Sequence, residues 1–114
     1  MWSIEYYQSV AGRYPVKDFI DSLDARGKAG IARTLDLLEE FGIELGMPYA
    51  RHIKKQLWEL RIREGRNRYR IIYFLAAGQG FVLLHGFSKK TGPIPRSDIE
   101  TAERRLNDYL SRRR

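Results

Sequence analysis

The stretch LWELRIREGRNRYRIIYFL, residues 57–75, constrains the fold of this chain more than any other part of its sequence. Apolar and charged side chains alternate along it, which is typical of β-strands that bury one face. The polar segment REGRN interrupts the alternation and is short enough to form a turn. We therefore predict a β-hairpin with strands at about 56–63 and 67–76.

The charged side chains of this predicted hairpin fall on one face, because successive side chains of a strand point to opposite sides. The residues on that face are Glu59, Arg61, Arg63, Arg68 and Arg70. Like charges at cross-strand distance repel each other and weaken the pairing. An RNA phosphate chain would offset this repulsion, because a guanidinium group binds phosphate in a bidentate geometry. Alternatively, carboxylates neutralise the arginines in ion pairs, and the candidates are Glu59, Asp98, Glu100 and Glu103.

The basic residues are concentrated in the second half of the chain. Residues 1–50 contain 5 Lys and Arg against 8 Asp and Glu, a net charge of −3. Residues 51–114 contain 16 Lys and Arg against 6 Asp and Glu, a net charge of +10. Such an asymmetry favours a polyanionic partner, most often a nucleic acid, over a basic surface that is merely solvated.

The composition suits a single domain over residues 1–114, because 43% hydrophobic residues are enough to build a core. The chain has no cysteine, which excludes disulfides and thiolate metal sites. It shows no signal peptide and no apolar run near the roughly 20 residues that a membrane span requires. We therefore expect a cytoplasmic protein with no membrane partner.

The elements before the hairpin are predicted from apolar spacing and from residues that start or end helices. Residues 2–8 alternate like a first strand. Pro15 suits the first position of a helix, and Asp24 is a candidate N-cap for a second helix. That second helix covers about 25–41, and Gly42 is placed to end it.

The remaining elements complete a small α+β domain. Residues 46–55 are predicted as a loop, residues 80–87 as the last strand, and the segment from Ser97 as the final helix. The predicted order is therefore β-α-α-β-β-β-α, with a small and mostly antiparallel sheet packed by helices.

Further basic residues flank the predicted strands. Lys54 and Lys55 stand before the hairpin, and Lys89 and Lys90 follow the last strand. Loops at strand ends often carry function, although any single lysine is more often solvated surface. The further residues that we predict to contact RNA are Lys54, Lys55, Arg63, Arg68, Lys89 and His52.

The chain has two histidines, His52 and His85. His52 lies in the predicted loop before the hairpin and is a candidate for acid–base chemistry or RNA contact. His85 shares its strand parity with Phe81, Leu83 and Phe87, which predicts that it faces the core. Two histidines without a clear carboxylate partner do not indicate a metal site, so we expect neither a metal nor a cofactor.

Three motifs together resemble a known family. LWELRI, RYRIIY and GFSKKTGPIPRSDIETAERRL occur in this order and spacing, and the likeness covers nearly the whole chain. The set is similar to the RelE/HigB-type toxins of bacterial type II toxin–antitoxin pairs, in particular the phage-derived HigB-like branch. The resemblance implies a RelE-like fold and an endoribonuclease that cuts messenger RNA in the ribosomal A site without a metal. It also implies a cognate antitoxin, often a helix-turn-helix protein.

The resemblance implies catalytic roles for matching positions on the hairpin. Arg70 matches a family arginine that follows a tyrosine, and Arg61 replaces a lysine of the preceding strand; both would stabilise the transition state. Glu59 also stands where the family has a lysine. It is a candidate general base for the ribose 2′-hydroxyl. The alternative is that Glu59 only orients Arg61 or Arg70 through an ion pair.

The resemblance is less complete outside the hairpin. Lys90, or Lys89 if the loop shifts by one residue, matches a basic residue that would assist departure of the 5′-oxygen. Glu100 stands near the place where the family has a tyrosine in the final helix. Two other functions therefore stay open. One is a ParE-like DNA gyrase poison with the same fold, and the other is a non-catalytic relative that binds only antitoxin or nucleic acid.

Overall fold

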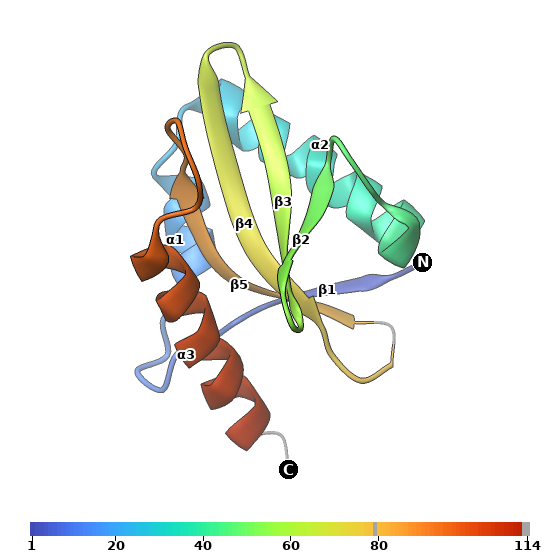
Figure 1. The fold of residues 1–114 in the computed structure, drawn as a ribbon, viewed down its shortest axis with the longest axis vertical. Helices are drawn as coiled ribbons and strands as arrows, with labels where there is room; N and C mark the ends of the chain where they lie inside the picture. Colours follow the sequence, from blue (N-terminus) through green and yellow to red (C-terminus); the bar gives the residue numbers. More distant parts are fainter. Residues whose placement is uncertain (79, 113–114) are drawn as a thin grey trace.

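The computed structural model describes residues 1–78 and 80–112 (Figure 1). Its elements are β1 (Ser3–Tyr6), α1 (Pro15–Asp21), α2 (Ala25–Phe41), the short 3-10 helix η1 (Gly42–Glu44), β2 (Ala50–Lys54), β3 (Leu57–Glu64), β4 (Asn67–Leu75), β5 (Gly80–Ser88) and α3 (Arg96–Arg112). The predicted α+β class is confirmed, because one five-stranded sheet is packed by helices. Among the described residues, no helix combines the length and apolar character needed to cross a membrane.

The five strands have the order β1-β5-β4-β3-β2. β1 runs parallel to β5, and every other neighbouring pair is antiparallel. The predicted hairpin is confirmed as β3 and β4, in which Arg61 lies opposite Arg70 and Arg63 lies opposite Arg68. The register therefore places these arginines in the cross-strand positions that alternation predicted.

The prediction of a loop over residues 46–55 is wrong in part, because Ala50–Lys54 form the edge strand β2. β2 pairs antiparallel with β3, with a shift of register between His52 and Lys54. Ala50 is the only fully buried residue of this strand, so its sequence lacks the alternation of a half-buried strand. Pairing with β3, and not a local pattern, makes this segment a strand.

Helices cover both faces of the sheet, with α1 and α2 behind it and α3 in front in Figure 1. The core on the side of α1 and α2 includes Val16, Ile31, Leu38, Leu60, Ile62, Ile71 and Leu83. The core on the side of α3 includes Leu57, Ile72, Phe74, Val82, Leu84, Ala102 and Leu106. The sheet is therefore the middle layer of three.

The residues predicted to start or end the first two helices occupy those positions in the structure. Pro15 occupies the start of α1. The Asp24 side chain accepts a hydrogen bond of 2.8 Å from the backbone N–H of Gly27, which caps α2. Gly42 ends α2 with φ +56, and a Cβ there would lie 2.1 Å from the Trp2 ring. Glycine is required at that position by both its backbone conformation and the close aromatic ring.

β5 contains an irregularity opposite β4 that changes which side its residues face. Ile72 pairs with His85, whereas the next residue, Tyr73, pairs with Leu83. The extra residue is a β-bulge, and it reverses the alternation beyond it. Leu83 and Phe81 face α1 and α2, but His85 faces α3. The predicted parity of His85 with Phe81 and Leu83 is therefore wrong, whereas its parity with Phe87 is confirmed, because the two rings stack with centroids 5.5 Å apart.

Candidate functional site

Only one half of the sheet face on the α3 side is covered by that helix. Along β4, the side chains on this face are first the apolar Phe74 and Ile72, which pack under α3, and then the charged Arg70. Along β3, the apolar Leu57 is followed on this face by the charged Glu59. The apolar half of the face thus has a helix to bury it, and the charged half lies beside the first turn of α3.

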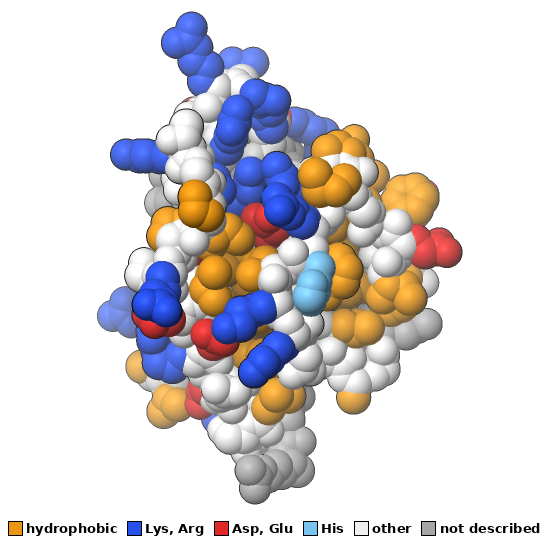
Figure 2. Space-filling model, in the orientation of Figure 1, with side chains coloured by type: hydrophobic (Ala, Val, Ile, Leu, Met, Phe, Trp, Pro, Cys, Tyr) orange, Lys and Arg blue, Asp and Glu red, His pale blue; other side chains and the backbone are white. Residues whose placement is uncertain are grey.

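A cavity of about 360 Å³ opens over the charged half. Side chains from β2, β3, β4, the loop 89–94 and the first turn of α3 line it. Its charged lining consists of Arg51, Arg61, Arg68, Arg70, Lys89, Lys90 and one carboxylate, Glu59. Figure 2 shows basic side chains gathered on this face around the upper parts of β3 and β4. All four predicted catalytic residues therefore line one cavity, which is strongly cationic.

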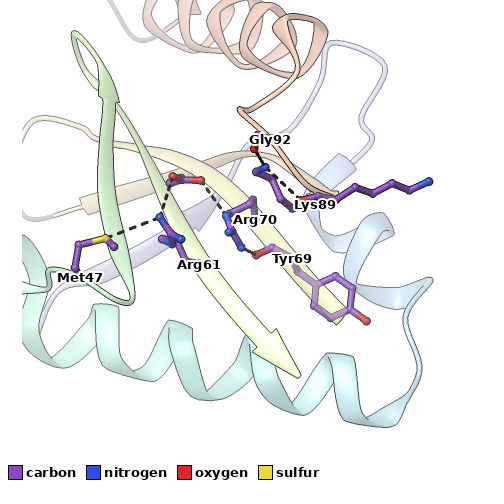
Figure 3. A network of polar contacts seen from close by, with 8 residues as sticks. Met47, Arg61, Tyr69, Arg70, Lys89 and Gly92 are labelled. Atoms are coloured by element: carbon purple, nitrogen blue, oxygen red, sulfur yellow. Dashed lines mark hydrogen bonds and ion pairs between the residues drawn. The ribbon is translucent and has the colours of Figure 1, made fainter. Parts of the chain in front are cut away.

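Glu59 and Arg70 form a buried ion pair in the wall of the cavity. Their relative exposures are 4% and 5%. Arg70 Nε lies 3.1 Å from Glu59 Oε1. Arg70 Nη1 donates a hydrogen bond of 3.0 Å to the carbonyl of Tyr69 (Figure 3). The carboxylate and the guanidinium group are thus each other's charge partner within the wall of the cavity.

Arg61 contacts the same carboxylate from the neighbouring position on β3. Its Nη1 lies 3.9 Å from Glu59 Oε2 and 3.9 Å from the sulfur of Met47 (Figure 3). Burial lowers the pKa of Arg70; Glu59 opposes this shift, and the charges of Arg61 and Arg68 add to it. One carboxylate therefore compensates the guanidinium groups only in part, and an anion in the cavity would relieve the remaining repulsion.

Lys89 fixes the loop that closes one side of the cavity. Its ammonium group donates to the carbonyl of Gly92 and, at 3.4 Å, to that of Lys90. Its backbone N–H donates to the carbonyl of Arg68 at 2.8 Å, which ties the loop to β4. Lys89 thus holds the loop, whereas Lys90 is an exposed cation in the lining.

Three predicted RNA-binding residues lie outside the cavity. Lys54 Nζ lies 3.1 Å from Glu103 Oε2 of α3. Lys55 is in the turn between β2 and β3, with φ +48. Arg63 lines a separate concavity beside α2. His52 does line the cavity, and its Nε2 lies 2.7 Å from the carbonyl of Lys55.

The predicted neutralisation of the arginines is confirmed for Glu59 and wrong for the acids of α3. Glu103 binds Lys54, and Asp98 binds His85. In the described part of the chain, no carboxylate of α3 pairs with a hairpin arginine. The helix is positioned to cover the apolar half of the face, so its acids lie away from the hairpin turn.

His85 is engaged on both ring nitrogens. Arg105 Nη1 donates to Nδ1 at 3.2 Å, so Nε2 carries the proton and donates to Asp98 Oδ1 at 2.7 Å. Burial lowers the pKa of His85, which agrees with a neutral ring. Across residues 1–78 and 80–112, no group of three or more His, Cys, Asp or Glu is placed to hold a metal.

Sequence reasoning missed part of the lining. These residues are Arg51, Ile53, Gly92, Pro93, Ile94 and Ile99. Two of them lie in the segment predicted as a loop, and the others lie in or just after the loop that follows β5. The sequence carries no signal for them, because a surface assembled from a strand, a loop and a helix has no periodicity along the chain.

Comparison with known proteins supports the likeness to phage-derived proteins. The family model described as Phage derived protein Gp49-like (DUF891) matches residues 18–107. This span includes every residue that lines the cavity. Among curated proteins, none matches the sequence. Because the family model covers most of the 114 residues, the chain belongs to the phage-derived Gp49-like family.

Proposed function

We propose that this protein is a ribosome-dependent messenger RNA endoribonuclease and the toxin of a toxin–antitoxin pair. One observation carries the proposal: the open cavity gathers six cationic side chains around a single carboxylate, Glu59. An RNA phosphate supplies the anion that such a site lacks. Membership of a phage-derived family and the resemblance to the HigB-like branch support the same class of function.

The proposed reaction is attack of a ribose 2′-oxygen on the adjacent phosphorus. The 2′-hydroxyl gives its proton to a base, the bond from phosphorus to the 5′-oxygen breaks, and that oxygen leaves with a proton from an acid. The products are a 2′,3′-cyclic phosphate and a 5′-hydroxyl. Arg70 and Arg61 are proposed to stabilise the negative charge that develops on the phosphate oxygens. Lys90 is proposed as the acid, because it is the exposed lysine of the lining.

Glu59 is proposed to position the arginines rather than to accept the proton. Its two oxygens lie 3.1 Å and 3.9 Å from guanidinium nitrogens of Arg70 and Arg61. A carboxylate whose two oxygens both face guanidinium groups can fix the orientation of those groups toward a phosphate. His52, which lines the cavity, is therefore proposed as the base: its Nε2 donates to the Lys55 carbonyl, which leaves Nδ1 free of a proton and able to accept the one from the 2′-hydroxyl.

The proposal also names the partners. The substrate is messenger RNA in the ribosomal A site, and the protein acts in the cytoplasm, where translation takes place. An antitoxin, in this branch often a helix-turn-helix protein, holds it in check. A gyrase poison of ParE type remains the rival function, but it gives no reason for Arg61, Arg70 and Lys90 to meet in one cavity.

The test is cleavage mapping on translating ribosomes. Purified protein is mixed with a translation reaction, and messenger cuts are mapped by primer extension beside a sample of naked RNA. We expect cuts only in the presence of ribosomes, and their loss in Arg70→Ala. Arg26→Ala, which removes an exposed arginine of α2 outside the cavity, is the matched control and should cut like the wild type.

Two results would contradict the proposal. Equal cutting of naked RNA would remove the dependence on ribosomes. No cutting under any condition would favour the gyrase function, which a supercoiling assay then tests directly.

A further inference from the structure

The cavity has two unlike walls, and phosphate binding explains only one of them. One wall is cationic and includes Arg61, Arg68 and Arg70. The other wall is apolar and is made by Ile53, Pro93, Ile94 and Ile99. These four residues come from β2, the loop before α3, and the first turn of α3. A single exposed apolar residue needs no explanation, but convergence of several from separate segments on one cavity does.

The apolar wall is only partly buried by the protein itself. Ile53, Ile94 and Ile99 are half-buried, in contrast to the fully buried Ile72 on the same side of the sheet. Ile53 and Ile99 pack on the α3 core from its edge. Part of each side chain therefore still faces the cavity, where a ligand can remove it from water.

The wall is also held in place. The backbone N–H of Lys89 donates a hydrogen bond of 2.8 Å to the Arg68 carbonyl, and the ammonium group of Lys89 donates to the Gly92 carbonyl. These bonds fix the start of the segment that carries Pro93 and Ile94 relative to β4. A site whose walls are already fixed loses little conformational freedom when a ligand binds, which lowers the entropic cost of binding.

We infer that the cavity is a subsite for one unpaired nucleotide, with its phosphate on Arg61 and Arg70 and the face of its base on Ile53, Ile94 and Ile99. The volume of about 360 Å³ is near the lower end for small-molecule sites, which span roughly 300–1,000 Å³. A nucleotide combines, at this scale, an anion with a flat apolar surface. RNA recognition by proteins commonly uses single-stranded bases that are splayed out in this way.

The chemistry of the apolar wall predicts its selectivity. Aliphatic side chains contact the face of a base and make no hydrogen bonds to its edge, so the subsite tolerates different bases. A purine covers more apolar surface than a pyrimidine and should bind more tightly. The inference deepens the proposed function and rests on it, because it identifies the bound polyanion as RNA.

The experiment measures binding of free mononucleotides to the full chain, without ribosomes. Chemical-shift titrations compare adenosine 5′-monophosphate, cytidine 5′-monophosphate, ribose 5-phosphate and inorganic phosphate. We expect adenosine monophosphate to bind about tenfold more tightly than ribose 5-phosphate. Cytidine monophosphate should lie between the two.

Two variants locate the base. Ile94→Ser and Ile99→Ala should each reduce the preference for adenosine monophosphate over ribose 5-phosphate by several-fold, with ribose 5-phosphate bound as before. Ile94 is in a loop, so its variant keeps the test valid if Ile99→Ala proves unstable. Ile43→Ser is the matched control, because Ile43 is 66% exposed on η1 outside the cavity and its loss should change nothing.

Each outcome decides the inference. Equal affinity for the nucleotide and ribose 5-phosphate, or no binding of any phosphate, would overturn it. A preference that survives both isoleucine variants would place the base elsewhere and overturn it as well. If nucleotides bind as expected but ribosomes show no messenger cleavage, the subsite stands and the proposed endonuclease activity fails.

Discussion

The sheet face on the α3 side has two halves of opposite character. In the covered half, Ile72 and Phe74 have relative exposures of 0% and pack under α3. In the open half, Glu59 and Arg70 are nearly as buried but are surrounded by charge. The two halves are continuous along β4, where a single residue, Ile71, lies between Arg70 and Ile72. The comparison teaches that burial by itself does not distinguish a core position from a site position.

The difference lies in how each half satisfies its buried groups. Apolar side chains need only contact, and α3 supplies it. Buried charges need partners of opposite sign, and Glu59 and Arg70 supply one another's within the wall of the cavity. We therefore expect the covered half to determine stability and the open half to determine activity.

The largest expected effect on stability comes from the covered half. Phe74→Ala removes a fully buried ring that packs on Tyr109, with ring centroids 5.6 Å apart. We expect the free energy of unfolding to fall by about 3–5 kcal/mol, because a large cavity remains. Urea denaturation measures the change. A loss below about 1 kcal/mol would show that the covered half is not the core.

Breaking the buried ion pair separates stability from activity. Arg70→Met leaves the Glu59 carboxylate buried without its cation, and we expect a loss of about 3 kcal/mol in unfolding free energy. The double variant Glu59→Gln/Arg70→Met should recover most of this loss, because no buried charge remains. Cleavage on ribosomes should stay at least roughly 100-fold below wild type in both variants. Recovery of cleavage in the double variant would show that the pair is only structural.

Glu59→Gln alone tests whether Glu59 positions the arginines or accepts the proton. The amide keeps the shape but loses the ion pairs, so cleavage should fall by up to about 100-fold through misplacement of Arg70. The pH dependence of the remaining activity should keep the wild-type shape. Disappearance of the acidic limb of the rate profile would instead identify Glu59 as the general base.

His85 should give a smaller, pH-dependent effect on stability. Its pKa in the folded protein is lowered by burial, so the folded state favours the neutral ring. The contribution to stability is fully present above the unfolded value of about 6.5 and is lost as pH falls through the lower folded value. Protonation also places a charge against Arg105, which now donates to Nδ1. Thermal unfolding from pH 7.5 to 5 measures this loss.

The His85 prediction has a matched variant. His85→Gln has no titratable ring, so its stability should vary less with pH over the same range. A curve parallel to that of the wild type would assign the pH dependence to other groups.

The smallest effect is expected for Lys54, which lies outside the cavity. Its ion pair with Glu103 has partners that are 47% and 37% exposed, so Lys54→Ala should change stability by less than about 1 kcal/mol. Messenger cleavage should stay near wild type. A strong loss of cleavage would extend the RNA surface beyond the open half of the sheet face.

The sequence predicted the hairpin and its charged face because these depend on local alternation. The period of two in residues 57–75 places Arg61 and Arg70 on the same side, and the register confirms it. Helix ends were predictable for the same reason, since Pro15, Asp24 and Gly42 act on the backbone next to them. Such signals lie within a few residues of their effect.

The missed features depend on contacts between segments that are distant in the sequence. β2 exists because it pairs with β3, and the bulge in β5 turns His85 toward Asp98 and Arg105. The isoleucine wall of the cavity joins β2, a loop and α3. No local pattern encodes these pairings.

The sequence by itself thus determined which side chains share a face, where the main helices begin and end, and that one face is strongly basic. The tertiary structure decided how far α3 extends over that face, and so which part of it stays open as a cavity. It also decided that Glu59 neutralises Arg70 from within the hairpin, while the acids of α3 bind elsewhere. The physical reason is that periodicity fixes the direction of a side chain, whereas its partner is fixed by the packing of elements far apart in the chain.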